Sequence, residues 1–125
     1  MENAKKILVV DDNRTIRLLL EKRLSAEGYR VVTAGDGSEG FSTAIREMPD
    51  LILSDVHMPV MDGGEMVSKL KATTKTSHIP VIFLTSLITK DEDKRPVGED
   101  WYISKMAKPT ELVTAVRQRL TLLPK

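Results

Sequence analysis

Five short, mostly apolar runs recur along the chain and are separated by longer stretches of mixed character. They occupy Ile7–Val10, Tyr29–Ala34, Leu51–Leu53, Val81–Leu84 and Trp101–Ile103. Short runs rich in β-branched residues are typical of strands that are buried on both faces, as in a parallel sheet. The pattern therefore predicts five strands.

The stretches between these runs carry apolar residues at the spacing of a helix face. The four sets are Ile16, Leu19, Leu20 and Leu24; Phe41, Ala44, Ile45 and Met48; Met66, Val67 and Leu70; and Leu112, Val113, Val116 and Leu120. Such spacing places each set on one side of a helix. Gly28 stands where a C-cap is expected, Ser38 is the predicted N-cap of the second helix, and Pro49 should end that helix. Pro109 suits the first turn of the last helix.

The segment from Thr89 to Val97 departs from this alternation, because it is charged and contains Pro96. Any helix there is expected to be weak or short. Elsewhere strands alternate with helices, which favours an α/β fold with a parallel sheet and right-handed crossovers. The chain has 125 residues and no internal repeat or linker, so residues 1–125 are predicted to form a single domain.

Composition excludes several function classes. The formal net charge is +1, so no strong field steers the protein toward nucleic acid or a membrane surface, and neither is an expected partner. No apolar run approaches the length of a membrane span, and Met1–Lys6 is too short and polar for a secretory signal. The absence of cysteine excludes disulfides and thiolate metal sites. A cytoplasmic protein is expected.

Residues with chemical potential cluster where the predicted strands end. The first strand ends in Asp11-Asp12, the third in Asp55, the fourth in Thr85-Ser86 and the fifth in Ser104-Lys105. In an open parallel sheet, ligands bind beyond the carboxyl ends of the strands. An Asp-Asp pair alone is more often a solvated turn or a helix cap. Compatible chemistry at four separate strand ends is much harder to explain in that way.

Together these side chains suit phosphoryl transfer to a carboxylate. Clustered carboxylates repel one another, and Mg²⁺ relieves that repulsion because it prefers oxygen ligands. Lys105 offers a positive charge to a phosphate group, and Thr85 offers a hydroxyl donor. An ordinary aspartate is negatively charged at neutral pH, so it needs no general base to act as a nucleophile. Catalysis then consists of alignment and charge neutralisation.

The chain also resembles the receiver domain of bacterial two-component response regulators, from Lys5 to about Leu123. Four segments carry the resemblance in order: "ILVVDDNRTIR", "PDLILSDVHMPVMDG", "IPVIFLTS" and "GEDWYISK". The second segment is the most specific match. The resemblance implies a doubly wound, flavodoxin-like three-layer sandwich with a five-stranded parallel sheet in the order 2-1-3-4-5.

The same resemblance implies a role for each matched residue. Asp55 accepts the phosphoryl group, and Mg²⁺ is held by Asp11, Asp12, Asp55 and the backbone carbonyl of His57. A ring nitrogen of His57 is a less favoured ligand, because Mg²⁺ prefers oxygen.

Further matched residues belong to the switch and to the loop after the site. Thr85 binds the phosphoryl group and moves toward it, Lys105 contacts the phosphoryl oxygens, and Tyr102 is the aromatic whose rotamer follows Thr85. For Tyr102, simple packing in the sheet is an equally good interpretation. The loop is shaped by Pro59, Asp62 and Gly63.

Two departures from the family pattern bear on the switch. Met106 follows Lys105 where the family usually has a cis proline, so we expect a trans Lys105-Met106 bond and a rearranged loop. The segment between Thr85 and Gly98 is about two residues shorter than usual and lacks an alanine-rich stripe. We expect the fourth helix to be short, displaced or missing, with Trp101 filling the space.

The leading hypothesis is a signalling module that takes its phosphoryl group from a phosphohistidine on a sensor kinase or phosphotransfer protein and then controls a downstream protein. Its enzymatic activity would be confined to its own phosphorylation and dephosphorylation. A phosphohydrolase is disfavoured, because His57 stands where such enzymes carry a second acid. A pseudo-receiver that binds partners without taking phosphate is the other alternative, and Met106 and the shortened segment keep it open.

Overall fold

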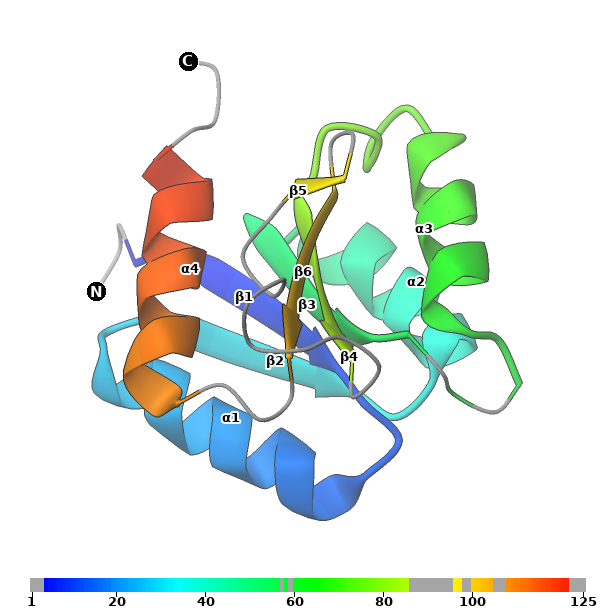
Figure 1. The fold of residues 1–125 in the computed structure, drawn as a ribbon. Coiled ribbons are helices and arrows are strands. Elements are labelled where there is room, and N and C mark those ends of the chain that lie inside the picture. Colours follow the sequence, from blue (N-terminus) through cyan, green and yellow to red (C-terminus); the bar gives the residue numbers. More distant parts are fainter. Residues whose placement is uncertain are drawn as a thin grey trace.

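The computed structural model describes residues 4–56, 58, 60–85, 96–97, 100–104 and 108–121. Within this part of the chain the elements are β1 (Lys6–Val10), α1 (Arg14–Ala26), β2 (Arg30–Ala34), α2 (Gly37–Glu47), β3 (Leu51–Asp55), α3 (Gly63–Lys71), β4 (Val81–Thr85), β5 (Pro96–Val97), β6 (Asp100–Ser104) and α4 (Pro109–Thr121). Figure 1 shows the sheet in the centre, with α1 and α4 on one side and α2 and α3 on the other. The predicted three-layer architecture is confirmed.

The sheet order is β2-β1-β3-β4-β6-β5. The first five strands in that order pair in parallel, and β6 is the fifth strand predicted from the sequence. The predicted parallel order 2-1-3-4-5 is therefore confirmed. The antiparallel pairing of the two-residue strand β5 with β6 was not predicted. Pro96 lies in that strand at the edge of the sheet, and edge strands are where sheets tolerate proline.

Two apolar cores lie on opposite faces of the sheet. Alternate residues of a strand point to opposite faces, so Ile7 and Val9 enter the core shared with α1 and α4. Leu8 and Val10 enter the core shared with α2 and α3. All four side chains are fully buried. This explains why the strand is apolar at consecutive positions rather than alternating.

The helix termini confirm three of the four boundary predictions. Gly28 follows the C-cap of α1 with a φ of 93°, a left-handed conformation that glycine adopts without strain. Helix α2 ends at Glu47 and Pro49 follows its C-cap, while Pro109 is the first residue of α4. The prediction of Ser38 as N-cap was wrong.

The N-cap of α2 is Asp36, whose carboxylate accepts from the backbone N–H of Glu39 at 2.8 Å. A carboxylate here also faces the positive end of the helix dipole. The helix begins two residues earlier than expected because Gly37 approaches the loop after β3, donating its N–H to the carbonyl of Met61 at 3.0 Å. A Cβ at position 37 would lie 2.2 Å from that carbonyl oxygen.

Three predictions concern residues or side chains outside the described part of the chain. They are the character of the helix expected between Thr85 and Gly98, the Lys105-Met106 peptide bond, and the space-filling role of the Trp101 side chain. Within the described residues, no helix has the length and apolar character to cross a membrane.

Candidate functional site

The carboxyl ends of β1, β3, β4 and β6 meet along one edge of the sheet. The register pairs Val10 with Ser54, so Asp11 and Asp55 follow directly on neighbouring strands. Thr85 pairs with Ser104 at the corresponding end of β4 and β6. The structure thus brings the predicted strand ends together along one edge. The last of these strands, β6, is described as far as Ser104.

Three carboxylates form the centre of this edge. One oxygen each from Asp11, Asp12 and Asp55 lies within 4.8 Å of the others. Asp11 is fully buried and Asp55 is 6% exposed, whereas Asp12 is exposed. The cluster is therefore walled by protein on one side and open to solvent at Asp12.

Asp11 is held in a turn between β1 and α1. Its backbone N–H donates to the carbonyl of Ala34 on β2 at 3.1 Å. Its carboxylate accepts from the N–H of Asn13 at 2.9 Å, and Asn13 in turn caps α1 by accepting from Ile16. Its carbonyl accepts from the guanidinium of Arg17 at 2.7 Å. The acidic pair is thus built into the start of the helix rather than placed on a loose loop.

Asp55 is fixed by its neighbours in sequence and by the start of α3. The Ser54 hydroxyl, itself fully buried, donates to the Asp55 carbonyl at 2.8 Å. Gly63 donates its N–H to the Val56 carbonyl at 2.8 Å. A Cβ at position 63 would lie only 2.4 Å from the Asp55 carbonyl oxygen. Position 63 therefore requires glycine for this close approach. The preceding residue, Asp62, is the N-cap of α3 and forms a capping box with Glu65.

The two predicted switch residues lie on adjacent strands. Thr85, at the end of β4, is buried, with 5% of its surface exposed. Tyr102 on β6 is half-buried and stacks on Phe83, with ring centroids 5.2 Å apart. The packing interpretation of Tyr102 is thereby supported, while its coupling to Thr85 stays a prediction.

Some predicted residues lie elsewhere or outside the described chain. His57, Pro59 and Lys105 are outside the described residues. His78, the other histidine of the chain, is exposed in a loop. Among the methionines near the site, Met66 is fully buried, and Met58 and Met61 pack against the core shared with α2 and α3.

Sequence reasoning missed Arg17 and Ser54, which hold the backbone of two acidic residues. The only signal for Arg17 was its position at the start of the second turn of the helix that follows the acidic pair. An arginine in such a place is usually a solvated surface residue. Ser54 interrupts the apolar run of β3 directly before Asp55, and a hydroxyl inside a buried strand must find an acceptor.

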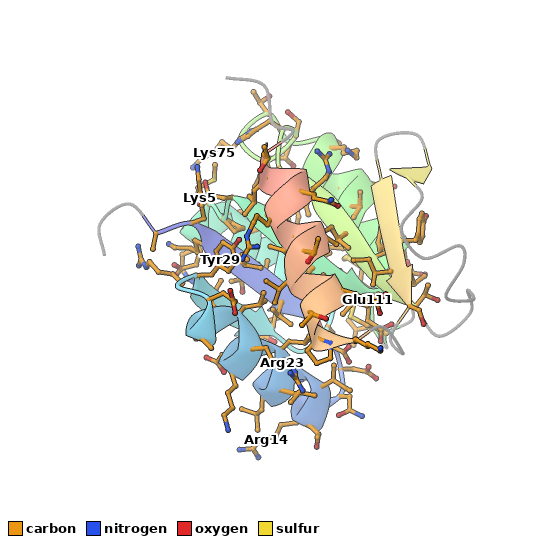
Figure 2. The ribbon with its side chains drawn as sticks, turned by 60° about the vertical axis from the view of Figure 1, so that its left-hand side comes forward. Lys5, Arg14, Arg23, Tyr29, Lys75 and Glu111 are labelled. Carbon is orange, nitrogen blue, oxygen red and sulfur yellow. The ribbon has the colours of Figure 1, made fainter. Side chains whose placement is uncertain are left out.

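A groove also separates α1 from α4 on the neighbouring face. Leu19, Leu20 and Arg23 of α1 and Pro109 and Leu112 of α4 line it. Figure 2 shows Arg23 between these two helices. The groove does not contain the carboxylates, so it is not part of the acidic cluster.

The acidic cluster fits a hard divalent cation. Mg²⁺ binds oxygen at about 2.1 Å in octahedral geometry, so its ligand atoms lie roughly 3–4 Å apart. Carboxylate oxygens within 4.8 Å of one another need only a small contraction to reach that spacing. The exposed position of Asp12 leaves room for the waters that Mg²⁺ retains.

Comparison with known proteins points to one family. The family model of the response regulator receiver domain matches residues 7–117. The probable transcriptional regulator ycf27 of Cyanophora paradoxa is 43% identical over 120 residues, covering 94% of this chain and 49% of that protein. Response regulator PleD of Caulobacter vibrioides is 50% identical over 82 residues, covering 66% of this chain and 18% of that protein. The chain spans about half the length of the ycf27 relatives it matches.

Solved structures agree with this assignment. The chemotaxis response regulator CheY4 of Vibrio cholerae superimposes with a TM-score of 0.81 at 30% identity, covering 94% of this chain and 99% of that one. The receiver domain of the sensor histidine kinase PA1611 of Pseudomonas aeruginosa gives a TM-score of 0.82 at 28% identity, covering 94% and 98%. That structure has a magnesium ion coordinated in its active site cleft.

Proposed function

The chain belongs to the response regulator receiver domain family, and we propose that Asp55 is the residue that accepts its phosphoryl group. The observation that carries the proposal is the placement of a buried carboxylate at a strand end, within 4.8 Å of two further carboxylates. The complete acid set disfavours a pseudo-receiver.

In the proposed reaction, a carboxylate oxygen of Asp55 attacks the phosphorus of a phosphohistidine. The new bond is an acyl phosphate, and the phosphorus–nitrogen bond breaks with its electron pair retained by the histidine ring. Ser54 and Gly63 restrict the backbone of Asp55, so the nucleophile is oriented before the donor arrives. Hydrolysis later returns Asp55 to the carboxylate and releases inorganic phosphate.

We propose that Asp11, Asp12 and Asp55 hold Mg²⁺, with the His57 carbonyl as a further oxygen ligand. When bound, the cation neutralises charge on the cluster and on the phosphoryl group. Asp12, the exposed member, faces the side from which a donor can approach.

Thr85 and Lys105 complete the proposed site. The Thr85 hydroxyl would donate to one phosphoryl oxygen and Lys105 would contact another, since Lys105 directly follows Ser104 at the end of β6. The stack of Tyr102 on Phe83 is the feature that a movement of Thr85 would disturb. This disturbance is the proposed route from phosphorylation to a change of surface, through a shift between two conformations.

Receiver domains interact with histidine kinases or phosphotransfer proteins and with downstream effectors. For this chain we propose a cytoplasmic location, a phosphohistidine donor on a sensor histidine kinase or phosphotransfer protein, and a downstream protein target. We further propose that its enzymatic activity is limited to its own phosphorylation and dephosphorylation.

The test is phosphorylation by acetyl phosphate with and without Mg²⁺, followed by intact mass. The wild type should gain one phosphoryl group only with Mg²⁺, and Asp55→Asn should gain none. Asp50→Asn is the matched control, because Asp50 accepts from the Lys6 backbone away from the cluster and should leave the gain unchanged. A folded wild type that gains no mass with Mg²⁺ would overturn the proposal in favour of a pseudo-receiver.

A further inference from the structure

Arg17 makes a contact that the phosphoryl chemistry does not explain. It lies in the second turn of α1 and is half-buried. Its Nη1 donates to the backbone carbonyl of Asp11 at 2.7 Å. A charged donor makes a shorter and stronger hydrogen bond than a neutral one, so this contact is a firm one.

The contact acts on the peptide that joins the two acidic residues of the cluster. The Asp11 carbonyl belongs to the peptide unit between Asp11 and Asp12, and a peptide unit is planar. Rotation of that plane would change the direction of both side chains. The Asn13 N–H fixes the Asp11 carboxylate and the Ala34 carbonyl fixes the Asp11 N–H, but neither restrains this plane directly. Arg17 does.

The guanidinium of Arg17 lies beside Gly35. A Cβ added at position 35 would lie 3.4 Å from Nη1 of Arg17, an ordinary van der Waals contact, and 3.3 Å from the Glu39 carboxylate oxygen that accepts from the Gly35 N–H. The other two arginines of α1 lie away from Gly35. Arg14 is exposed at the tip of the helix, and Arg23 lies toward α4 (Figure 2).

We propose that Arg17 is a positioning residue for the Mg²⁺ site, acting through the Asp11-Asp12 peptide rather than through contact with the metal or the phosphoryl group. The inference rests on the proposed function, because it assumes that the acidic cluster holds Mg²⁺. Partners that orient metal ligands from outside the coordination shell typically contribute about 10–100-fold to metal affinity. The single contact to a backbone carbonyl places Arg17 at the lower end of this range.

The experiment compares wild type, Arg17→Met and Arg17→Lys in the full chain. The Mg²⁺ dissociation constant is measured by titration calorimetry at fixed ionic strength. Phosphorylation by acetyl phosphate is followed across the same Mg²⁺ range. Arg17→Met should raise the dissociation constant about tenfold, while the rate at saturating Mg²⁺ stays within about twofold of wild type. Arg17→Lys keeps one charged donor and should recover part of the affinity.

A metal-free readout separates positioning from charge. Amide hydrogen exchange at Asn13, whose N–H binds the Asp11 carboxylate, should become faster in Arg17→Met without any Mg²⁺ present. The matched control is Arg117→Met. It removes a guanidinium that binds α1 at its other end through Glu27, at 3.3 Å, and should alter neither Mg²⁺ affinity nor Asn13 exchange.

Three results would overturn the inference. Unchanged Mg²⁺ affinity in Arg17→Met would reduce the residue to a stabiliser of α1. Tighter Mg²⁺ binding would show that its positive charge opposes the cation more than its hydrogen bond helps. No Mg²⁺ binding by the wild type would remove the proposed metal site as well. A wild type that binds Mg²⁺ but accepts no phosphoryl group refutes only the proposed function, and the affinity comparison still decides the role of Arg17.

Discussion

Substitution of Gly63 by alanine tests the link between packing and the acceptor site. The new Cβ would lie 2.4 Å from the Asp55 carbonyl oxygen and 3.1 Å from the Phe83 ring. The first neighbour is backbone inside the buried strand β3, so it cannot move aside as the end of a side chain could. Either α3 or the end of β3 must shift.

The expected loss of stability combines two destabilising effects with one stabilising effect. Overpacking of a well-filled site costs about 1–3 kcal/mol, and the displaced Gly63 N–H also weakens its bond to the Val56 carbonyl, worth about 1 kcal/mol. Alanine in place of glycine in a helix recovers about 0.5–1 kcal/mol. We therefore expect Gly63→Ala to lower the free energy of unfolding by about 2 kcal/mol.

Gly64→Ala is the matched control, because Gly64 is the next residue of the same helix and is exposed. The nearest atom to its added Cβ is a side-chain oxygen of Asp62 at 3.4 Å. This variant should be neutral or more stable by up to about 1 kcal/mol. Urea unfolding measures both variants, and acetyl phosphate labelling should be slower in Gly63→Ala alone. Equal stability of the two variants would refute the reasoning from the close approach to Asp55.

Three further predictions address strain, pH and metal. Val60 is 83% exposed and has a φ of 69°, so Val60→Asn should raise the free energy of unfolding by about 0.5–1 kcal/mol in urea titrations. Hydrogen bonds from Lys6, and then Arg46, hold the pKa of Glu47 below its ordinary value. This stabilisation is present above the unfolded pKa of about 4.3 and is lost as pH falls through the folded pKa, so the stability difference between wild type and Lys6→Met should shrink on acidification. Asp12→Asn should raise the melting temperature of the metal-free protein, because it removes the repulsion of a clustered carboxylate, about 1 kcal/mol for each pair at the dielectric of water. The same variant should show a smaller increase in melting temperature when Mg²⁺ is added.

Most of the fold could be predicted because its strands are short, apolar and evenly separated. The runs at Ile7–Val10 and Val81–Leu84 are too short for helices and rich in β-branched residues, and their alternation with helical faces restricts the topology. The N-cap of α2 was misplaced because Asp36, Gly37 and Ser38 are all acceptable in a turn. The choice depends on the Met61 carbonyl, which is distant in sequence and comes close only in the folded protein.

Within the candidate site, side chains that perform chemistry were easier to predict than side chains that orient them. One carboxylate at a strand end is often only a turn or a cap, but compatible side chains at four strand ends have few structural explanations. Asp11, Asp12 and Asp55 could therefore be singled out, and they are found together. Arg17 and Ser54 act on backbone carbonyls, and every residue has a carbonyl. No residue type or spacing reveals which carbonyl a donor will reach.

The sheet register explains why the site could be derived at all. Parallel pairing of Val10 with Ser54 makes the residues that follow, Asp11 and Asp55, adjacent without any contribution from a loop. A shift of the register by one residue would exchange the side chains that point to the two faces, and the close packing of both cores opposes such a shift. The core packing that stabilises the fold thus also fixes the distance between the acidic residues. The position of the acceptor depends on the core, and the orientation of its neighbours depends on single polar contacts such as that of Arg17.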